Sequence, residues 1–170
     1  MEQRTDTGGE ASAFGFLTVV DSPAHGIFGG YLLVDAAGRP LEFHCTAPVK
    51  VSRAQAILYG PTLVGHLHGR QIGGALLAEG GVAPVVVLTD QEAMLQVRPH
   101  TSLPVAFVRR ATAADDPAGF TVGAAHVGPT GGDGGRQAAI QDRLAELGAA
   151  VDLCEPFERI RAAIDEAQKH

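Results

Sequence analysis

The sequence predicts a single α+β domain, with an N-terminal antiparallel meander of three strands, a βαβ-like extension of the same mixed sheet, and C-terminal helices. Three observations predict this class. Strand-like segments separated by short turns come first, two apolar runs flank a helix-sized interval, and the last third has helical periodicity. Residues 1–12 are small and polar and are expected to form a flexible tail, so the domain spans 13–170.

The first three strands are predicted at 14–20, 27–34 and 41–46, where apolar, β-branched and aromatic residues concentrate. The turns between them are short, and Gly38 suits a positive φ. Such closely linked strands favour antiparallel pairing. The first two runs are apolar on both faces and need cover from helices or from a neighbouring chain.

Helices are predicted next. Ser52 and Gln55 have the spacing of a capping box, and Gly60-Pro61 ends the short helix that they begin. Pro61 suits the first position of a second helix. That helix is expected to run to about residue 79, and its buried stripe is expected to consist of Leu63, Leu67, Leu76 and Leu77.

The rest of the chain alternates strands and helices. Strands are predicted at 82–88 and 103–108, joined by a short helix that Asp90 is expected to cap, and a weaker strand at 120–126. A glycine-rich loop at 128–135 lacks the phosphate-binding patterns and is expected to be a surface loop. The final helices are predicted from recurrent apolar residues at Ile140, Leu144 and Leu147, and at Phe157, Ile160 and Ile164.

The best-placed polar residues follow the two predicted parallel strands. Asp90 ends the first, and Arg109 and Arg110 end the second. Ligands of open α/β sheets bind at the carboxyl ends of strands, so these three residues form the candidate ligand-binding site. The structural alternative is that Asp90 caps a helix and the arginines mark where a strand meets water.

The histidines and cysteines are not expected to form a metal site. Alternation along a strand puts Leu41, Phe43 and Cys45 on one face, predicted to be buried, and Glu42, His44 and Thr46 on the exposed face. His66 and His68 are two residues apart, which separates them by about 200° around a helix. His44 and His68 remain weak candidates as proton carriers, with Asp90 as a weak catalytic candidate, and no cofactor is predicted.

Composition limits the function. A formal net charge of −6 and 5% aromatic residues disfavour nucleic acid as a partner. No apolar stretch is long enough to span a membrane, no secretory signal is visible, and no CxxC motif occurs, so a cytoplasmic location is expected.

Two functions remain open, and whether the chain is an enzyme is not determined. The preferred hypothesis is a non-catalytic binding or accessory module, a homo-oligomer or a subunit of a larger bacterial-type assembly, because no catalytic motif occurs. The alternative is a small hydrolase or transferase acting on a phosphorylated or carboxylated small molecule. In that case Asp90 serves in acid–base chemistry or binds a metal, and Arg109 and Arg110 hold the anion.

Overall fold

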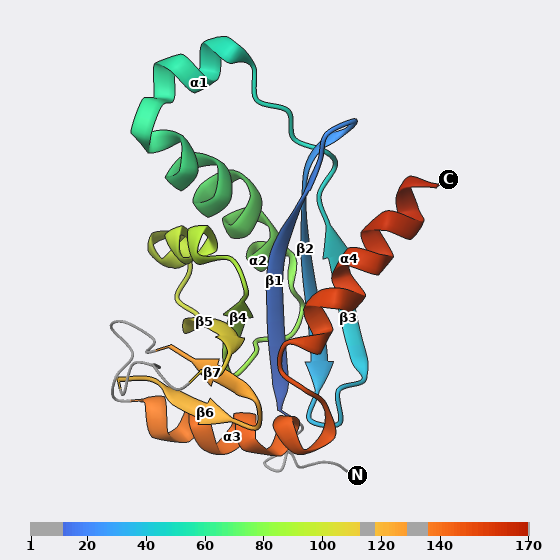
Figure 1. The fold of residues 1–170 in the computed structure, drawn as a ribbon, viewed down its shortest axis with the longest axis vertical. Helices are drawn as coiled ribbons and strands as arrows, with labels where there is room; N and C mark the ends of the chain where they lie inside the picture. Colours follow the sequence, from blue (N-terminus) through green and yellow to red (C-terminus); the bar gives the residue numbers. More distant parts are fainter. Residues whose placement is uncertain (1–11, 113–117, 129–135, 170) are drawn as a thin grey trace.

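The computed structural model describes residues 12–112, 118–128 and 136–169. Its seven strands form one mixed sheet with the order β3-β2-β1-β4-β5-β7-β6 (Figure 1). This confirms the predicted α+β class. The predicted tail at 1–12 and the predicted loop at 128–135 lie outside the described residues, except for Ser12 and Gly128.

The predicted meander is confirmed. Strands β1 (Ala13–Ser22), β2 (Gly26–Asp35) and β3 (Pro40–Cys45) pair antiparallel in sequence order. Gly38 adopts φ +81° in the β2–β3 turn, a left-handed conformation that glycine adopts without strain.

The βαβ-like extension is also confirmed. Strand β4 (Val87–Thr89) pairs parallel with β1, and β5 (Val105–Arg110) pairs parallel with β4. The connection between them is a 3₁₀ helix, η4 (Glu92–His100). Asp90 does not cap this helix, which corrects the prediction, because Thr18 and Arg161 engage its carboxylate.

The single strand predicted at 120–126 is wrong. The chain instead forms a hairpin of β6 (Phe120–Val122) and β7 (Ala125–Val127), with Gly123 at φ +59° in the turn. A short weakly periodic segment does not reveal such a turn, because only one glycine marks it.

Residues 53–79 are helical almost throughout. They form α1 (Arg53–Tyr59), a 3₁₀ turn η2 (Gly60–Thr62), a π-helix η3 (Gly65–Gly74) and α2 (Ala75–Glu79). The capping box is confirmed: the Gln55 amide donates to Ser52 Oγ at 3.1 Å and the Ser52 amide to Gln55 Oε1 at 3.0 Å. Within the described part of the chain, no helix is both long and apolar enough to cross a bilayer.

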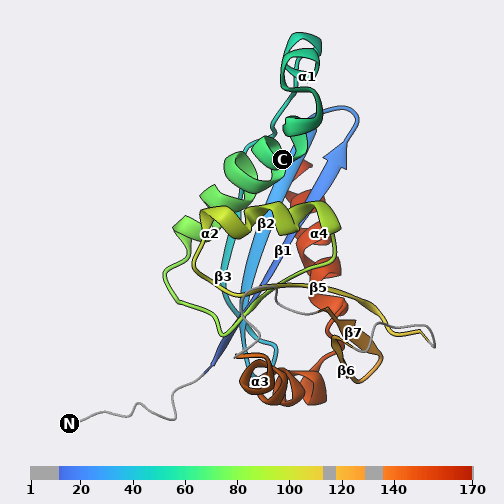
Figure 2. The same cartoon turned by 90° about the vertical axis from the view of Figure 1, so that its left-hand side faces the viewer.

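Helices cover both faces of the sheet (Figures 1 and 2). On one face, α3 (Gln137–Ala150) and α4 (Glu155–Gln168) bury the predicted stripes against the side chains of Phe14 and Phe16. On the other face, η3, α2 and η4 cover Leu17 and Val19. The need for cover on both faces is therefore met by helices of the chain itself.

The buried and exposed faces of strand β3 are the reverse of those predicted. Leu41, Phe43 and Cys45 are exposed, whereas Glu42 and His44 are half-buried beside Tyr31 of β2. The prediction failed because β3 is an edge strand, and α4 packs over β1 and β2. The apolar face of β3 therefore lies beside the helix and is only partly covered.

Candidate functional site

The carboxyl end of β4, which lies beside the middle of β1, holds a polar cluster around Asp90. Thr18, fully buried on β1, donates its hydroxyl to Asp90 Oδ1 at 2.6 Å, and the Arg161 guanidinium of α4 donates to Oδ2. The parallel register of β1 and β4, in which Leu17 lies opposite Thr89, brings Thr18 beside Asp90. Arg161 also contacts Glu158 at 3.3 Å.

Asp90 follows β4, and Arg109 and Arg110 end the adjacent strand β5; the ion pairs of Asp90 and Arg110 each lead to a residue in or next to α4. Arg110 pairs with Asp152, which precedes α4, and the Arg109 guanidinium donates to the Arg110 carbonyl at 2.9 Å. The Arg110 guanidinium, followed by the Cys154 amide at 2.8 Å, lowers the pKa of the Asp152 carboxyl. Arg161, the true partner of Asp90, carries no local signal in the sequence because it lies 71 residues away.

These ion pairs occupy two of the arginines that could otherwise bind an anionic ligand at the strand ends. A clamp for an anionic substrate needs guanidinium groups that are available to the ligand. Here Arg161 is engaged by Asp90 and Arg110 by Asp152. The nearby Cys154 thiol is not activated, because burial raises its pKa. In the structure, the Asp90–Arg161 pair connects α4 to the end of β4.

A second polar cluster lies on the edge strand. His44 Nε2 lies 2.8 Å from Glu42 Oε1, its Nδ1 lies 3.6 Å from Glu79, and its ring stacks on Tyr31 with centroids 6.4 Å apart. The Gly81 amide donates to Glu42 at 2.9 Å and, with His44, lowers the pKa of that carboxyl. Burial, followed by the Glu42 charge, raises the pKa of Tyr31. Tyr31 is therefore a neutral phenol at physiological pH.

The remaining histidine candidates lie in η3 in different surroundings. His66 stacks on Tyr59 of α1 with ring centroids 4.4 Å apart. His68 is half-buried, its Nδ1 has no hydrogen-bond partner, and burial lowers its pKa. Over residues 12–112, 118–128 and 136–169, no three His, Cys, Asp or Glu side chains are placed to hold a metal ion.

The least expected feature is a helical arm, residues 53–64, that extends from one end of the molecule (Figures 1 and 2). No residue of α1 is buried. Ile57 is 69% exposed, Leu58 is 84% exposed, and Val64 is also exposed. Large aliphatic side chains gathered on an exposed element mark interaction surfaces more often than isolated ones do.

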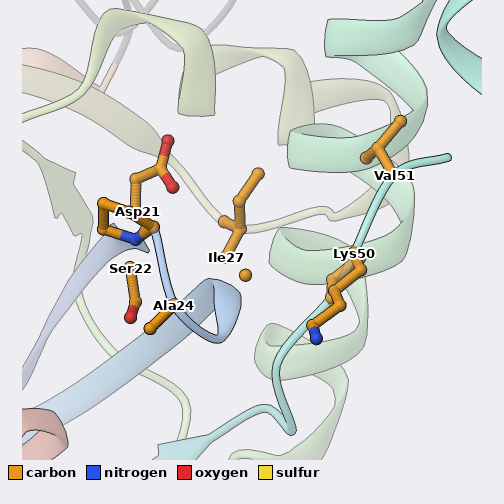
Figure 3. A pocket seen from close by; sticks show the side chains of 9 residues that line it. Asp21, Ser22, Ala24, Ile27, Lys50 and Val51 are labelled. Atoms are coloured by element: carbon orange, nitrogen blue, oxygen red, sulfur yellow. The ribbon is translucent and has the colours of Figure 1, made fainter. Parts of the chain in front are cut away.

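A groove of about 380 Å³ lies at the base of the arm. Its walls are the β1–β2 hairpin, with Asp21 and Ile27, and the segment leading to α1, with Val49, Lys50 and Val51 (Figure 3). The Val49 amide donates to the Ile27 carbonyl at 2.8 Å and the Ile27 amide to the Val49 carbonyl at 2.8 Å, which ties the two walls together. The arm and this groove are two candidate surfaces for binding at the same end of the molecule.

Comparisons with known proteins do not assign the chain to a family. No protein-family model matches it, and no curated protein matches it. Among solved structures, it is similar to Ciona intestinalis endonuclease V in complex with a 23mer DNA containing an inosine followed by a ribo-adenosine. The identity is 10%, the TM-score is 0.39, and the alignment covers 62% of this chain and 48% of that chain, about half its length.

This neighbour is a DNA complex, which contradicts the prediction that nucleic acid is disfavoured as a partner, and that prediction is withdrawn. Net charge averages over the chain and does not by itself exclude nucleic acid as a partner. Residues 43–78 contain Lys50, Arg53 and Arg70 and no acidic residue, so this segment carries +3 and the rest −9. At a TM-score of 0.39, this likeness does not show what the chain itself binds.

Proposed function

We propose that the chain is a protein-binding module that uses the arm as its docking element. The observation that carries the proposal is the exposure of Ile57 and Leu58 on a helix that buries nothing within its own chain. Transferring a large aliphatic side chain from water to an apolar interface contributes about 1.5–3 kcal/mol. Covering Ile57 and Leu58 would therefore contribute substantially to the free energy of binding a partner.

The charge of the arm supports a partner with an acidic rim. Arg53 and Lys50 are exposed, and no acidic residue lies between Glu42 and Glu79. Electrostatic complementarity of this kind guides association and selects the partner more than it adds affinity. The apolar pair Ile57 and Leu58 then supplies most of the binding free energy.

The polar cluster supports a non-catalytic role, because Asp90 and Arg110 are each engaged in an ion pair within the chain. The proposal includes a cytoplasmic location. The two cysteines, Cys45 and Cys154, are free thiols, as is usual in a reducing compartment.

The test compares three tagged proteins in affinity capture from cells of the source organism: wild type, the double variant Ile57→Ser/Leu58→Ser, and Val82→Ser. Val82 is an exposed aliphatic residue outside the arm and serves as the matched control. We expect wild type and Val82→Ser to retain the same protein, and the double variant to lose it. Calorimetry with the purified partner should then show at least a tenfold weaker affinity, about 1.4 kcal/mol, for the double variant.

Two results contradict the proposal. If all three proteins capture the partner equally, the arm does not take part in binding it. Labelled DNA and RNA oligonucleotides provide the other outcome: binding that weakens with salt and with Arg53→Ser, but not with the double aliphatic variant, assigns the arm to nucleic acid.

A further inference from the structure

Strand β3 presents an open edge with apolar side chains. It is the outermost strand of the sheet, so its outer backbone groups face no further strand of the described chain (Figure 1). Leu41 is 46% exposed, Phe43 is 40% exposed, and Cys45 is exposed beside them. Such an edge is a template for pairing with another strand, and proteins usually protect it.

The pairing of β3 with β2 determines which groups point outward. The Thr46 amide donates to the Gly29 carbonyl at 3.0 Å, and the register places His44 opposite Tyr31. In an antiparallel ladder, alternate residues bond to the same neighbour. Thr46, His44 and Glu42 therefore bond inward, and the amide and carbonyl of Phe43 point away from the sheet.

The sequence around Phe43 is complementary to itself. In an antiparallel pair of two copies centred on Phe43, each Phe43 lies opposite the other. Leu41 lies opposite Cys45 on one face, and Glu42 lies opposite His44 on the other. Moving the centre two residues toward Cys45 puts Glu42 opposite Pro48, and moving it two residues back puts it opposite Pro40. Among these registers, only the one centred on Phe43 pairs carboxylate with imidazole.

We propose that the chain forms a two-fold symmetric dimer in which the β3 strands of two copies pair antiparallel about Phe43. One face of the joint carries the apolar side chains of Leu41, Phe43 and Cys45 from both copies. The other face carries an alternating network in which each Glu42 adjoins an imidazole of its own strand and one of the second copy. This surface is separate from the arm.

Existing contacts already orient the groups that the dimer needs. Glu42 is held by the Gly81 amide, and His44 is held by Glu42 and by the ring of Tyr31. Little side-chain freedom is then lost on pairing. The strand is only six residues long, so the interface is small and the dimer is expected to depend on protein concentration.

The first test is a self-cross-link. Residues directly opposite in a hydrogen-bonded antiparallel pair have Cα atoms about 5.5 Å apart, within the range that a disulfide spans. Phe43→Cys is made in a background of Cys45→Ser and Cys154→Ser and oxidised at several concentrations. Ala149→Cys, at an exposed position on α3, is the matched control for random collision.

We expect Phe43→Cys to form a disulfide-linked dimer at least tenfold faster than Ala149→Cys. Light scattering of the wild-type chain should show the mass rising from 17.6 kDa toward twice that value with concentration. A constant monomer mass at all concentrations, or equal cross-linking rates for the two cysteines, overturns the proposal. The wild-type measurement requires no substitution, so a folding defect in a variant does not affect it.

The second test uses the charge pattern. Adding His44→Glu to the Phe43→Cys protein puts like charges opposite one another and should slow cross-linking at least tenfold. Adding Glu42→His as well restores a carboxylate–imidazole pair across the two-fold axis and should recover the rate. Circular dichroism checks that each protein is folded. A double exchange that stays as slow as His44→Glu contradicts the register centred on Phe43.

Discussion

Helices α4 and α1 both have apolar residues, yet the molecule uses them in opposite ways. In α4, Phe157, Ile160 and Ile164 are buried against the sheet, and Arg161 on its polar side reaches Asp90 of the strand end. In α1, nothing is buried. The difference indicates that α4 stabilises the fold, whereas α1 has an apolar surface that its own chain does not cover.

Local interactions alone account for the shape of α1. A seven-residue helix is marginal in isolation because nucleation is costly, and most helices depend on tertiary packing. The capping box satisfies two amides at the start of α1, and the Tyr59–His66 stack connects its end to η3. These contacts explain how the helix persists without a core, and four substitutions test the comparison.

The largest effect is expected from Phe157→Ala in α4. The ring of Phe157 is buried and meets that of Phe16 edge-on, with centroids 5.3 Å apart. Removing it leaves a cavity under α4, and the free energy of unfolding should fall by about 3–5 kcal/mol. Urea unfolding measures this change. A loss below about 1 kcal/mol would show that α4 is as dispensable to the fold as we infer α1 to be.

Asp90→Asn tests the polar attachment of α4 and should cost about 1–3 kcal/mol, because it weakens charge-assisted hydrogen bonding to Arg161 beside the buried Thr18. The matched control is Asp165→Asn, an exposed residue on the same helix that pairs with Lys169 at 3.7 Å. Its cost should stay below about 0.5 kcal/mol. Equal losses for the two variants would remove any special role for Asp90.

Asp152→Asn gives a pH-dependent test at the start of α4. Arg110 and the Cys154 amide lower the pKa of Asp152 in the folded state below its ordinary 3.8. Stabilisation from this carboxylate is therefore present above pH 3.8 and is lost as the pH falls through the lower folded-state value. Since the pair is partly exposed, the variant should lose about 0.5–1 kcal/mol at pH 7.

The difference in the free energy of unfolding between wild type and Asp152→Asn should decrease as the pH is lowered toward 3. A gap that widens on acidification would mean that the protonated side chain, and not the ion pair, holds the α3–α4 junction.

The smallest effect is expected from Leu58→Ser in the arm. Because Leu58 is almost fully exposed, the free energy of unfolding of the isolated chain should change by no more than about 0.5 kcal/mol. Thermal unfolding of the purified protein checks this. A loss above 1 kcal/mol would indicate that the arm is packed against its own chain in solution, and the contrast with α4 would disappear.

Much of the fold was accessible to sequence reasoning because it depends on near neighbours. The three-strand meander, the Ser52–Gln55 capping box and the stripe of α4 all follow from residue types within one turn or one hairpin. The βαβ-like extension was predictable for the same reason. The hairpin at Gly123 was not, because its strands are only three residues long.

The candidate sites were harder to predict from the sequence. Asp90 was correctly expected at a strand end, but its partner Arg161 comes from a helix whose position against β4 no local pattern encodes. The exposed arm was missed because apolar residues such as Ile57 and Leu58 are ordinarily assigned to a core. Their spacing does not reveal whether another element of the chain covers them.

Local patterns in the sequence specify the order and type of the main elements, since backbone hydrogen bonding and side-chain periodicity act over a few residues. The packing of distant elements leaves Phe43 partly exposed, pairs Arg161 with Asp90 and leaves α1 uncovered. The physical reason is that burial depends on which distant element lies on top of a face. That choice is made by the packing of the whole chain.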